Sequence, residues 1–233
     1  MSSCLKTVAS PSDHLGYRAG HGQSALICMN VYFRKAAEAD ARSLSRICLL
    51  TADAGTTAEH LHEYVELPGL VYAVPYIKLP TTFGFVLVLQ GSDEVVGYVV
   101  GSTDTRVYEC EAGETWWPPL QHRYPLNGAR GKEADRLYLS LIHNMPTASP
   151  ANISFSPAHI HINILPPYQG KGYGRQLIDM AVEYLKDQGL KGLWVGLDTR
   201  NESARRFYLK LGFRDIGASP PGNMCLDFVD WKG

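Results

Sequence analysis

The sequence predicts an α/β (α+β) domain in which a central mixed, mostly antiparallel sheet carries helices on both faces. Two β-rich runs, 83–89 and 95–101, are joined across a turn signal at 91–94 and should form an antiparallel hairpin. Both runs are nearly continuous in apolar residues, which is typical of strands covered on each side. Further along, an alternating strand runs directly into a glycine-rich turn and an amphipathic helix.

Size and composition agree with one domain. The chain has 233 residues, of which 45% are hydrophobic, whereas a domain usually takes about 100–200 residues. We therefore expect a single domain over 31–233, with an insertion at about 103–157 and an N-terminal extension at 1–30. The extension mixes Ser, Gly, His and Asp without a period, so it should be partly disordered or laid across the domain.

Charge and cysteine usage exclude several classes. A net charge of −1 gives no basic footprint for nucleic acid or an anionic membrane. No apolar run reaches the roughly 18–20 residues that cross a bilayer, and the N-terminus lacks the apolar core of a secretory signal. We therefore expect a cytoplasmic or nuclear protein. The five cysteines form no C-x-x-C pair, which argues against a disulfide framework or a zinc ribbon.

The first half of the domain should contain a strand, two helices and the hairpin. Residues 31–34 are β-rich, and apolar residues at helical spacing predict a helix over about 38–50 that ends near Gly55. A second helix is predicted over 58–65, because Pro68 should end it.

Between 103 and 157 the pattern breaks into a polar and aromatic insertion with a helix around 132–142. It contains the run Trp116-Trp117-Pro118-Pro119. An insertion of this length usually has a function. It is either a surface elaboration packed on its own aromatic residues or a wall of the substrate pocket, and we favour the pocket wall.

The strand at 158–165 alternates between two faces. One face carries His159, His161 and Asn163, and the other carries Ile160, Ile162 and Ile164. Pro166-Pro167 then removes two backbone donors, so pairing with a neighbouring strand should fail there. A helix over 172–188, a strand at 193–197, a short helix after Asn201 and one or two strands within 213–231 complete the domain.

The segment 165–175, LPPYQGKGYGR, predicts an anion site. Glycines at 170, 172 and 174 let the backbone curl around a ligand in front of a helix N-terminus, and Lys171 and Arg175 add positive charge. A dinucleotide fingerprint fails because Arg175 or Leu177 stands where the last glycine is needed. A Walker loop fails because Gly172 follows Lys171.

Two motifs in this order resemble the GNAT family of acetyl-CoA-dependent N-acetyltransferases. The first is Q-x-x-G-x-G, from Gln169 to Gly174, and the second is N-x-x-A-x-x-F-Y-x-x-x-G-F, over 201–213. The resemblance covers about 158–213 strongly and 31–101 only as topology. It implies the GNAT fold, with the sheet splayed between strands 4 and 5.

The resemblance also implies acetyl-CoA as cofactor and a role for each motif residue. Unpaired backbone near Leu165 would bind the pantetheine arm as an added strand, with Ile164 and Leu165 contacting the arm and the thioester. Asn201 with Arg205 or Tyr208 would flank the arm. The pyrophosphate would be held by Gln169, Gly170, Lys171, Gly172, Tyr173, Gly174 and Arg175.

In the implied reaction an amine attacks the acetyl thioester directly, an oxyanion forms against a strand N–H, and Tyr208 protonates the departing thiolate. The alternative for Tyr208 is a packing role. His159 and His161 are the candidate bases because imidazole titrates near neutrality, and their alternative is also packing. Asn163 could position the acceptor. The two histidines have no third ligand nearby, so no metal is expected.

Three functions remain open. The chain is an N-acetyltransferase for a small-molecule or peptide amine, a catalytically weak or inactive CoA-binding domain with a regulatory or scaffolding role, or a transferase for a longer acyl group. Residues 159–170 also resemble the acetyltransferase-like domain associated with O-GlcNAc hydrolases, and domains of that kind can keep the fold without the activity.

Overall fold

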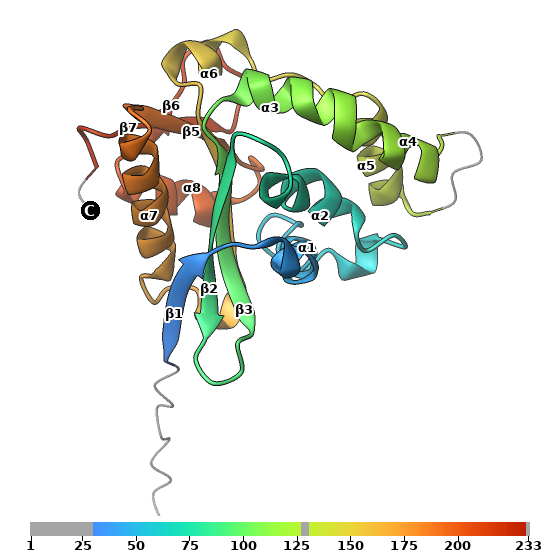
Figure 1. Ribbon diagram of the computed structural model, residues 1–233, viewed down its shortest axis with the longest axis horizontal. Helices are drawn as coiled ribbons and strands as arrows, with labels where there is room; N and C mark the ends of the chain where they lie inside the picture. The colour runs from blue at the N-terminus through green and yellow to red at the C-terminus, as the bar shows by residue number, and fades with distance from the viewer. Residues whose placement is uncertain (1–29, 127–130, 232–233) are drawn as a thin grey trace, which may run out of the picture.

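The computed structural model describes residues 30–126 and 131–231. The expected extension therefore lies outside the described residues, apart from Asn30. Within these ranges a seven-stranded sheet has the order β1-β2-β3-β4-β5-β7-β6, and only β4 and β5 are parallel neighbours (Figure 1). The strands are β1 Val31–Lys35, β2 Thr82–Leu89, β3 Val95–Ser102, β4 His159–Ile164, β5 Gly192–Gly196, β6 Arg214–Asp215 and β7 Asn223–Asp227.

Helices cover both faces of this sheet, as expected (Figure 1). The core on one face joins α7 to β2, β3, β4 and β5, and the core on the other joins α1 to β2 and β3. The helices are α1 Ala41–Leu49, α2 Leu67–Tyr72, α3 Thr105–Glu111, α4 Trp117–Arg123, α5 Glu133–His143, α6 Pro150–Phe155, α7 Tyr173–Asp187 and α8 Glu202–Lys210. In the described part of the chain, no helix combines the length and apolar character needed to cross a membrane.

The sheet parts between β4 and β5, which confirms the splayed sheet of the prediction. These strands share a single register pair, His159 with Trp194, and the Trp194 amide donates to the Ala158 carbonyl at 3.0 Å. On its other edge β4 pairs with β3 along its whole length. The parting begins just after His159, well before Pro166, so the prolines follow the parting and do not cause it.

The predicted helix over 58–65 is wrong. That segment holds only a short 3₁₀ turn, Glu59–Leu61, and the helix proper is α2, in whose first turn Pro68 lies. Proline is well suited to the first turn because the N–H that it lacks would have no partner there and its φ is already helical. Pro68 therefore starts a helix where the prediction made it end one.

The insertion is much more helical than the single helix predicted around 132–142. It contains α3, a π turn at Ala112–Trp116, α4, α5 and α6. Proline again lies in the first turn, of α4 and of α6. The Trp116 indole donates to the Leu70 carbonyl at 3.0 Å, and a third hydrophobic core packs α4 and α5 against α2.

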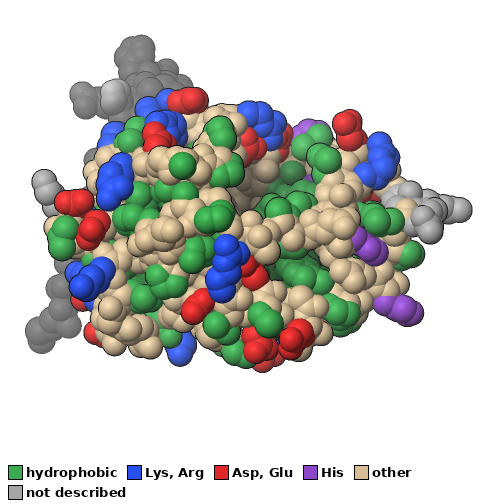
Figure 2. Space-filling model, turned by 90° about the horizontal axis from the view of Figure 1, so that it is seen from above, with side chains coloured by type: hydrophobic (Ala, Val, Ile, Leu, Met, Phe, Trp, Pro, Cys, Tyr) green, Lys and Arg blue, Asp and Glu red, His purple; other side chains and the backbone are tan. Residues whose placement is uncertain are grey.

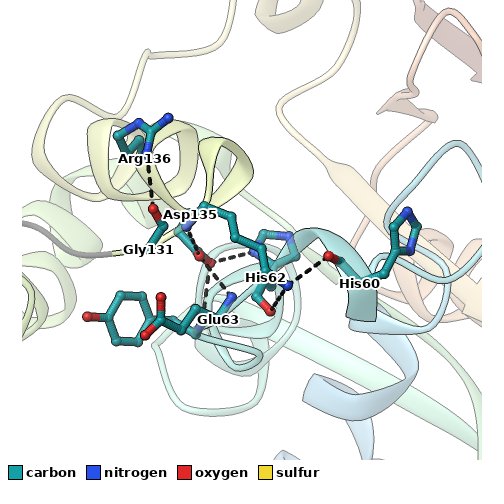
Figure 3. Close-up of polar contacts among 8 residues, drawn as sticks. His60, His62, Glu63, Gly131, Asp135 and Arg136 are labelled. Carbon is teal, nitrogen blue, oxygen red and sulfur yellow. Dashed lines mark hydrogen bonds and ion pairs between the residues drawn. The ribbon is translucent and has the colours of Figure 1, made fainter.

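Asp135 ties the insertion to the rest of the domain (Figure 3). Its carboxylate, fully buried, accepts from the amides of Glu63 and Lys132 at 2.8 Å each and lies 2.8 Å from His62 Nδ1. Burial alone would raise the pKa of Asp135, but the Glu63 and Lys132 amides and His62 hold it below its usual value. We call Asp135, His62 and these two amides the Asp135 clamp; it fixes α5 against segment 59–66.

Candidate active site

A cavity of about 700 Å³ lies where β4 and β5 part. Among the predicted site residues, it brings together His159 and His161 from β4 with Tyr208 from α8 and Asn201, the N-cap of that helix. The insertion contributes residues of α3, α4 and α5 to the lining, so it forms one wall of this cavity. Figure 2 shows the molecule from above, with hydrophobic side chains interspersed among charged ones and a hollow near the centre of this face.

A chain of hydrogen bonds along the cavity fixes both imidazoles. The Thr105 hydroxyl donates to the Pro157 carbonyl at 2.6 Å, so its oxygen accepts from His159 Nδ1 at 2.7 Å. His159 Nε2 then accepts from the Tyr76 hydroxyl at 2.8 Å, and the Tyr76 oxygen accepts from His161 Nε2 at 3.1 Å. The lone pair of His161 is therefore on Nδ1, which makes no hydrogen bond within the described part of the chain.

Burial changes how these histidines titrate. It lowers the pKa of His159 well below its usual value, with the nearby His161 acting in the same direction, and it lowers the pKa of His161 to about 4. This corrects the expectation that the pair titrates near neutrality, because desolvation disfavours the imidazolium form. Both rings are neutral at pH 7, and both nitrogens of His159 are already engaged.

Tyr208 lies near the end of α8, where its side chain is 5% exposed and lines the cavity. Burial raises its pKa, so the phenol keeps its proton at neutral pH. Its hydroxyl has no hydrogen-bond partner among residues 30–126 and 131–231. The helix begins as predicted, because the Asn201 side chain accepts from the Ala204 amide at 2.9 Å.

The glycine loop lies outside this cavity, in front of α7. Gly170 and Gly172 have φ values of +71° and +83°, which side chains rarely adopt, and Gly172 is the N-cap of α7, so no side chain caps this helix. Gly174 was expected to let the backbone curl around a ligand, but the structure gives it a packing role. A Cβ there would lie 2.9 Å from Phe207 Cζ, so this glycine lets α7 pack against α8.

The remaining predicted residues are placed around the loop and the strand end. Gln169 Nε2 donates to the Ile164 carbonyl at 2.7 Å, which ties the loop to β4. Ile164 and Leu165 pack in the hydrophobic core and do not line the cavity.

Arg205 makes two short hydrogen bonds with the Asp215 carboxylate, at 2.6 and 2.8 Å, and lines a second cavity of about 410 Å³. Lys171 lies 5.7 Å from the Tyr168 ring centroid, and Tyr173 and Arg175 belong to the first turn of α7.

Several cavity residues were missed by the sequence analysis, among them Tyr76 and Trp194. Tyr76 is separated from His159 by 83 positions and from His161 by 85, and no local pattern links them. Trp194 interrupts an aliphatic strand, which was the available signal. Its indole Nε1 is buried and, in the described ranges, without a partner, although Trp194 lines the cavity.

Comparison with known proteins identifies the relatives of this chain. Residues 143–213 match the model of the acetyltransferase (GNAT) family. A [ribosomal protein bS18]-alanine N-acetyltransferase of Haemophilus influenzae is 41% identical over 56 residues, which cover 24% of this chain and 38% of that protein. The chain therefore spans well under half the length of this relative. A solved structure described as SsHAT has a TM-score of 0.75 at 29% identity and covers 85% of this chain and 98% of its own.

Protein O-GlcNAcase of Rattus norvegicus is 21% identical over 140 residues, which cover 59% of this chain and 15% of that protein. The similarity to O-GlcNAc hydrolases is thus present, at low identity.

Proposed function

This chain belongs to the GNAT acetyltransferase family, and we propose that it transfers an acetyl group from acetyl-CoA to the nitrogen of an amine. One observation carries the proposal. The strands β4 and β5 part after one pair, and the cavity at the parting is lined by a neutral imidazole, His161, and by a protonated phenol, Tyr208. Those are the two groups that an acyl transfer between nitrogen and sulfur requires.

The residues present fit acetyl-CoA, which supplies an activated acetyl thioester when bound. Beyond His159, β4 pairs with no strand of the described ranges on its β5 side, so its open edge can hydrogen-bond an extended arm that carries amides. The unpartnered Trp194 indole is a donor at the same place. The N-terminus of α7, which has a glycine as its cap, would hold the pyrophosphate beside Lys171.

His161 would accept the proton of the attacking amine at Nδ1. An alkylammonium has a pKa near ~10, so an imidazole whose pKa is about 4 cannot deprotonate it before the attack. The acceptor nitrogen must therefore arrive neutral. Its N–H becomes acidic only as its lone pair forms the new bond to carbon, and at that stage a weak base such as His161 suffices. His159 would orient the Tyr76 hydroxyl. Tyr76 in turn would hold His161 in the tautomer that carries its proton on Nε2.

Tyr208 would donate its proton toward the departing sulfur. Its raised pKa keeps the phenol protonated at every pH at which the protein would work, and the lack of a partner within the described residues leaves the hydroxyl available. The backbone N–H groups along the open edge of β4 would stabilise charge that develops on the acyl oxygen.

The weakness of His161 as a base also favours the alternative, a CoA-binding domain with little or no catalysis. The deciding experiment measures thiol release from acetyl-CoA across a panel of amines, together with calorimetric binding of CoA. We expect release that depends on the amine. Binding of CoA without release for any amine would establish the alternative, and a preference for longer thioesters would indicate transfer of a longer acyl group.

A further inference from the structure

The insertion side of the cavity is built from aromatic rings in mutual contact. Tyr76 stacks on Tyr108, with ring centroids 4.6 Å apart and planes 10° apart. Tyr72 meets Tyr138 edge-on at 6.0 Å and lies 5.5 Å from the His161 ring. With Trp117, these four tyrosines line the cavity and form what we call the aromatic wall.

The aromatic wall is electrically neutral. Burial raises the pKa of Tyr72, Tyr76, Tyr108 and Tyr138, so none of these phenols ionises near neutral pH. Leu141 and Met145 extend the apolar surface. A flat aromatic body placed here would pack offset or edge-on against these rings, which are the arrangements that aromatic pairs prefer.

The charged side chains that line the cavity in the described part of the chain are both acidic. Its lining within the described residues contains the carboxylates of Glu109 and Asp198, and no lysine or arginine. Glu109 accepts from the Ala148 amide at 2.6 Å and pairs with Arg106 at 2.5 Å, and Asp198 pairs with Arg200 at 2.7 Å. A ligand carboxylate would be buried against two acidic side chains with no cation in the described lining, which is costly, whereas an amine would meet several ring faces and the two arginine-paired carboxylates.

Tyr72 connects the wall to the chemistry, because it is in ring contact with both Tyr138 and His161. A body that packs against Tyr72 and Tyr138 can therefore place an amino group next to His161. In such a ligand, a short linker would join the aromatic ring to the reacting amine nitrogen.

We propose that the acceptor is an arylalkylamine, a primary amine on an aromatic body that lacks a carboxylate. The proposal rests on the proposed function and names its substrate class. It excludes free amino acids, because their carboxylate would be buried with no cation in the lining that the structure describes, and it makes peptide lysine a poor acceptor, because an alkyl side chain places no ring against the aromatic wall.

The test compares three small amines by thiol release from acetyl-CoA. 2-Phenylethylamine, L-phenylalanine and n-hexylamine share a primary amine but differ in carboxylate and ring. We expect kcat/KM for 2-phenylethylamine to exceed that for L-phenylalanine by about 10-fold or more, because the buried carboxylate has no cation. It should exceed that for n-hexylamine by about 3- to 10-fold, because the alkyl chain makes no ring contact. A lysine peptide serves as the fourth substrate.

Variants on α5 test the wall itself. Tyr138→Leu removes a ring and keeps an apolar side chain, so the ratio of 2-phenylethylamine to n-hexylamine should fall toward one. Leu137→Ala is the matched control, since Leu137 is 64% exposed on the same helix and should leave the ratio unchanged. Circular dichroism verifies that both variants fold.

The outcomes separate this inference from the proposed function. Thiol release that is fastest with L-phenylalanine or the lysine peptide overturns the arylalkylamine assignment and leaves an acetyltransferase. If no amine releases thiol, calorimetry on the wild-type protein decides. Saturable binding of 2-phenylethylamine without binding of L-phenylalanine supports the assignment, and equal binding or none overturns it.

Discussion

The Tyr76 hydroxyl lies 3.1 Å from Nε2 of His161, and this contact decides which imidazole nitrogen is free. The same hydroxyl donates to His159 at 2.8 Å, so this phenol passes on to His161 the tautomer that Thr105 imposes on His159.

Replacing Tyr76 by Phe should weaken both the fold and the chemistry. His159 Nε2 would lose its donor in a buried position, which costs about 1–3 kcal/mol of unfolding free energy. His161 would no longer be held with its lone pair on Nδ1, so kcat should fall. Urea denaturation and steady-state rates measure the two effects. Tyr72→Phe is the control, because Tyr72 touches His161 only through its ring; similar losses in both variants would contradict the tautomer assignment.

Stability should fall as the pH drops from about 6.5 to about 4. The unfolded histidines bind protons near pH 6.5, whereas burial lowers the pKa of His161 to about 4 and that of His159 further. Protons therefore bind the unfolded state preferentially in this window, and His161 alone accounts for a loss of up to about 3 kcal/mol.

Urea denaturation at several pH values checks this dependence, and His161→Gln should make it shallower. His60→Gln, at an exposed ring, should leave it unchanged. An identical slope in wild type and His161→Gln would mean that His161 titrates normally. The carboxyl groups with lowered pKa, such as Asp40, lose their contribution only at lower pH.

Tyr208→Phe should lower kcat by about 10²–10⁴-fold, the usual contribution of a positioned acid, while the calorimetric Kd for CoA stays the same. The phenol keeps its proton at neutral pH because burial raises its pKa, and the variant removes only that donor. Tyr184→Phe, which removes a hydroxyl from a ring packed on Phe83, serves as control. Wild-type turnover in Tyr208→Phe would leave this tyrosine with a packing role alone.

Gly172→Ala should weaken CoA binding more than it weakens the fold. Its φ of +83° costs an alanine about 1–2 kcal/mol, and relief of this strain would move the first turn of α7. Gly189→Ala carries similar strain, at φ +78°, just after the other end of the same helix. Calorimetry with CoA distinguishes the two. Equal losses of affinity would remove the loop from the cofactor site.

The sequence predicted those parts that depend on neighbours along the chain. The alternation of β4 placed its histidines on one face, and Asn201 marked the start of α8 because its side chain caps that helix. Pro68 led to a wrong helix prediction, since proline suits a first helical turn as well as it ends a helix.

Contacts between distant segments could not be read in this way. Tyr76 reaches the histidines only because the helical segment before β2 packs on β3 and β4. The low pKa of His161 is likewise a property of burial, which a residue type does not reveal. The sequence predicted two candidate bases, His159 and His161. Only the hydrogen bonds of the folded protein show that His161 Nδ1 is the nitrogen that keeps a free lone pair within the described residues.

The Asp135 clamp supports the aromatic wall from the side that faces away from the cavity. His62, held by Asp135, also packs edge-on against Tyr138 at 5.2 Å, and neither Asp135 nor His62 lines the cavity. A substitution at the clamp can therefore tilt a ring of the wall while every reacting group stays in place. Related proteins that acquire such substitutions would change their preferred amine through mutations at residues that do not line the cavity.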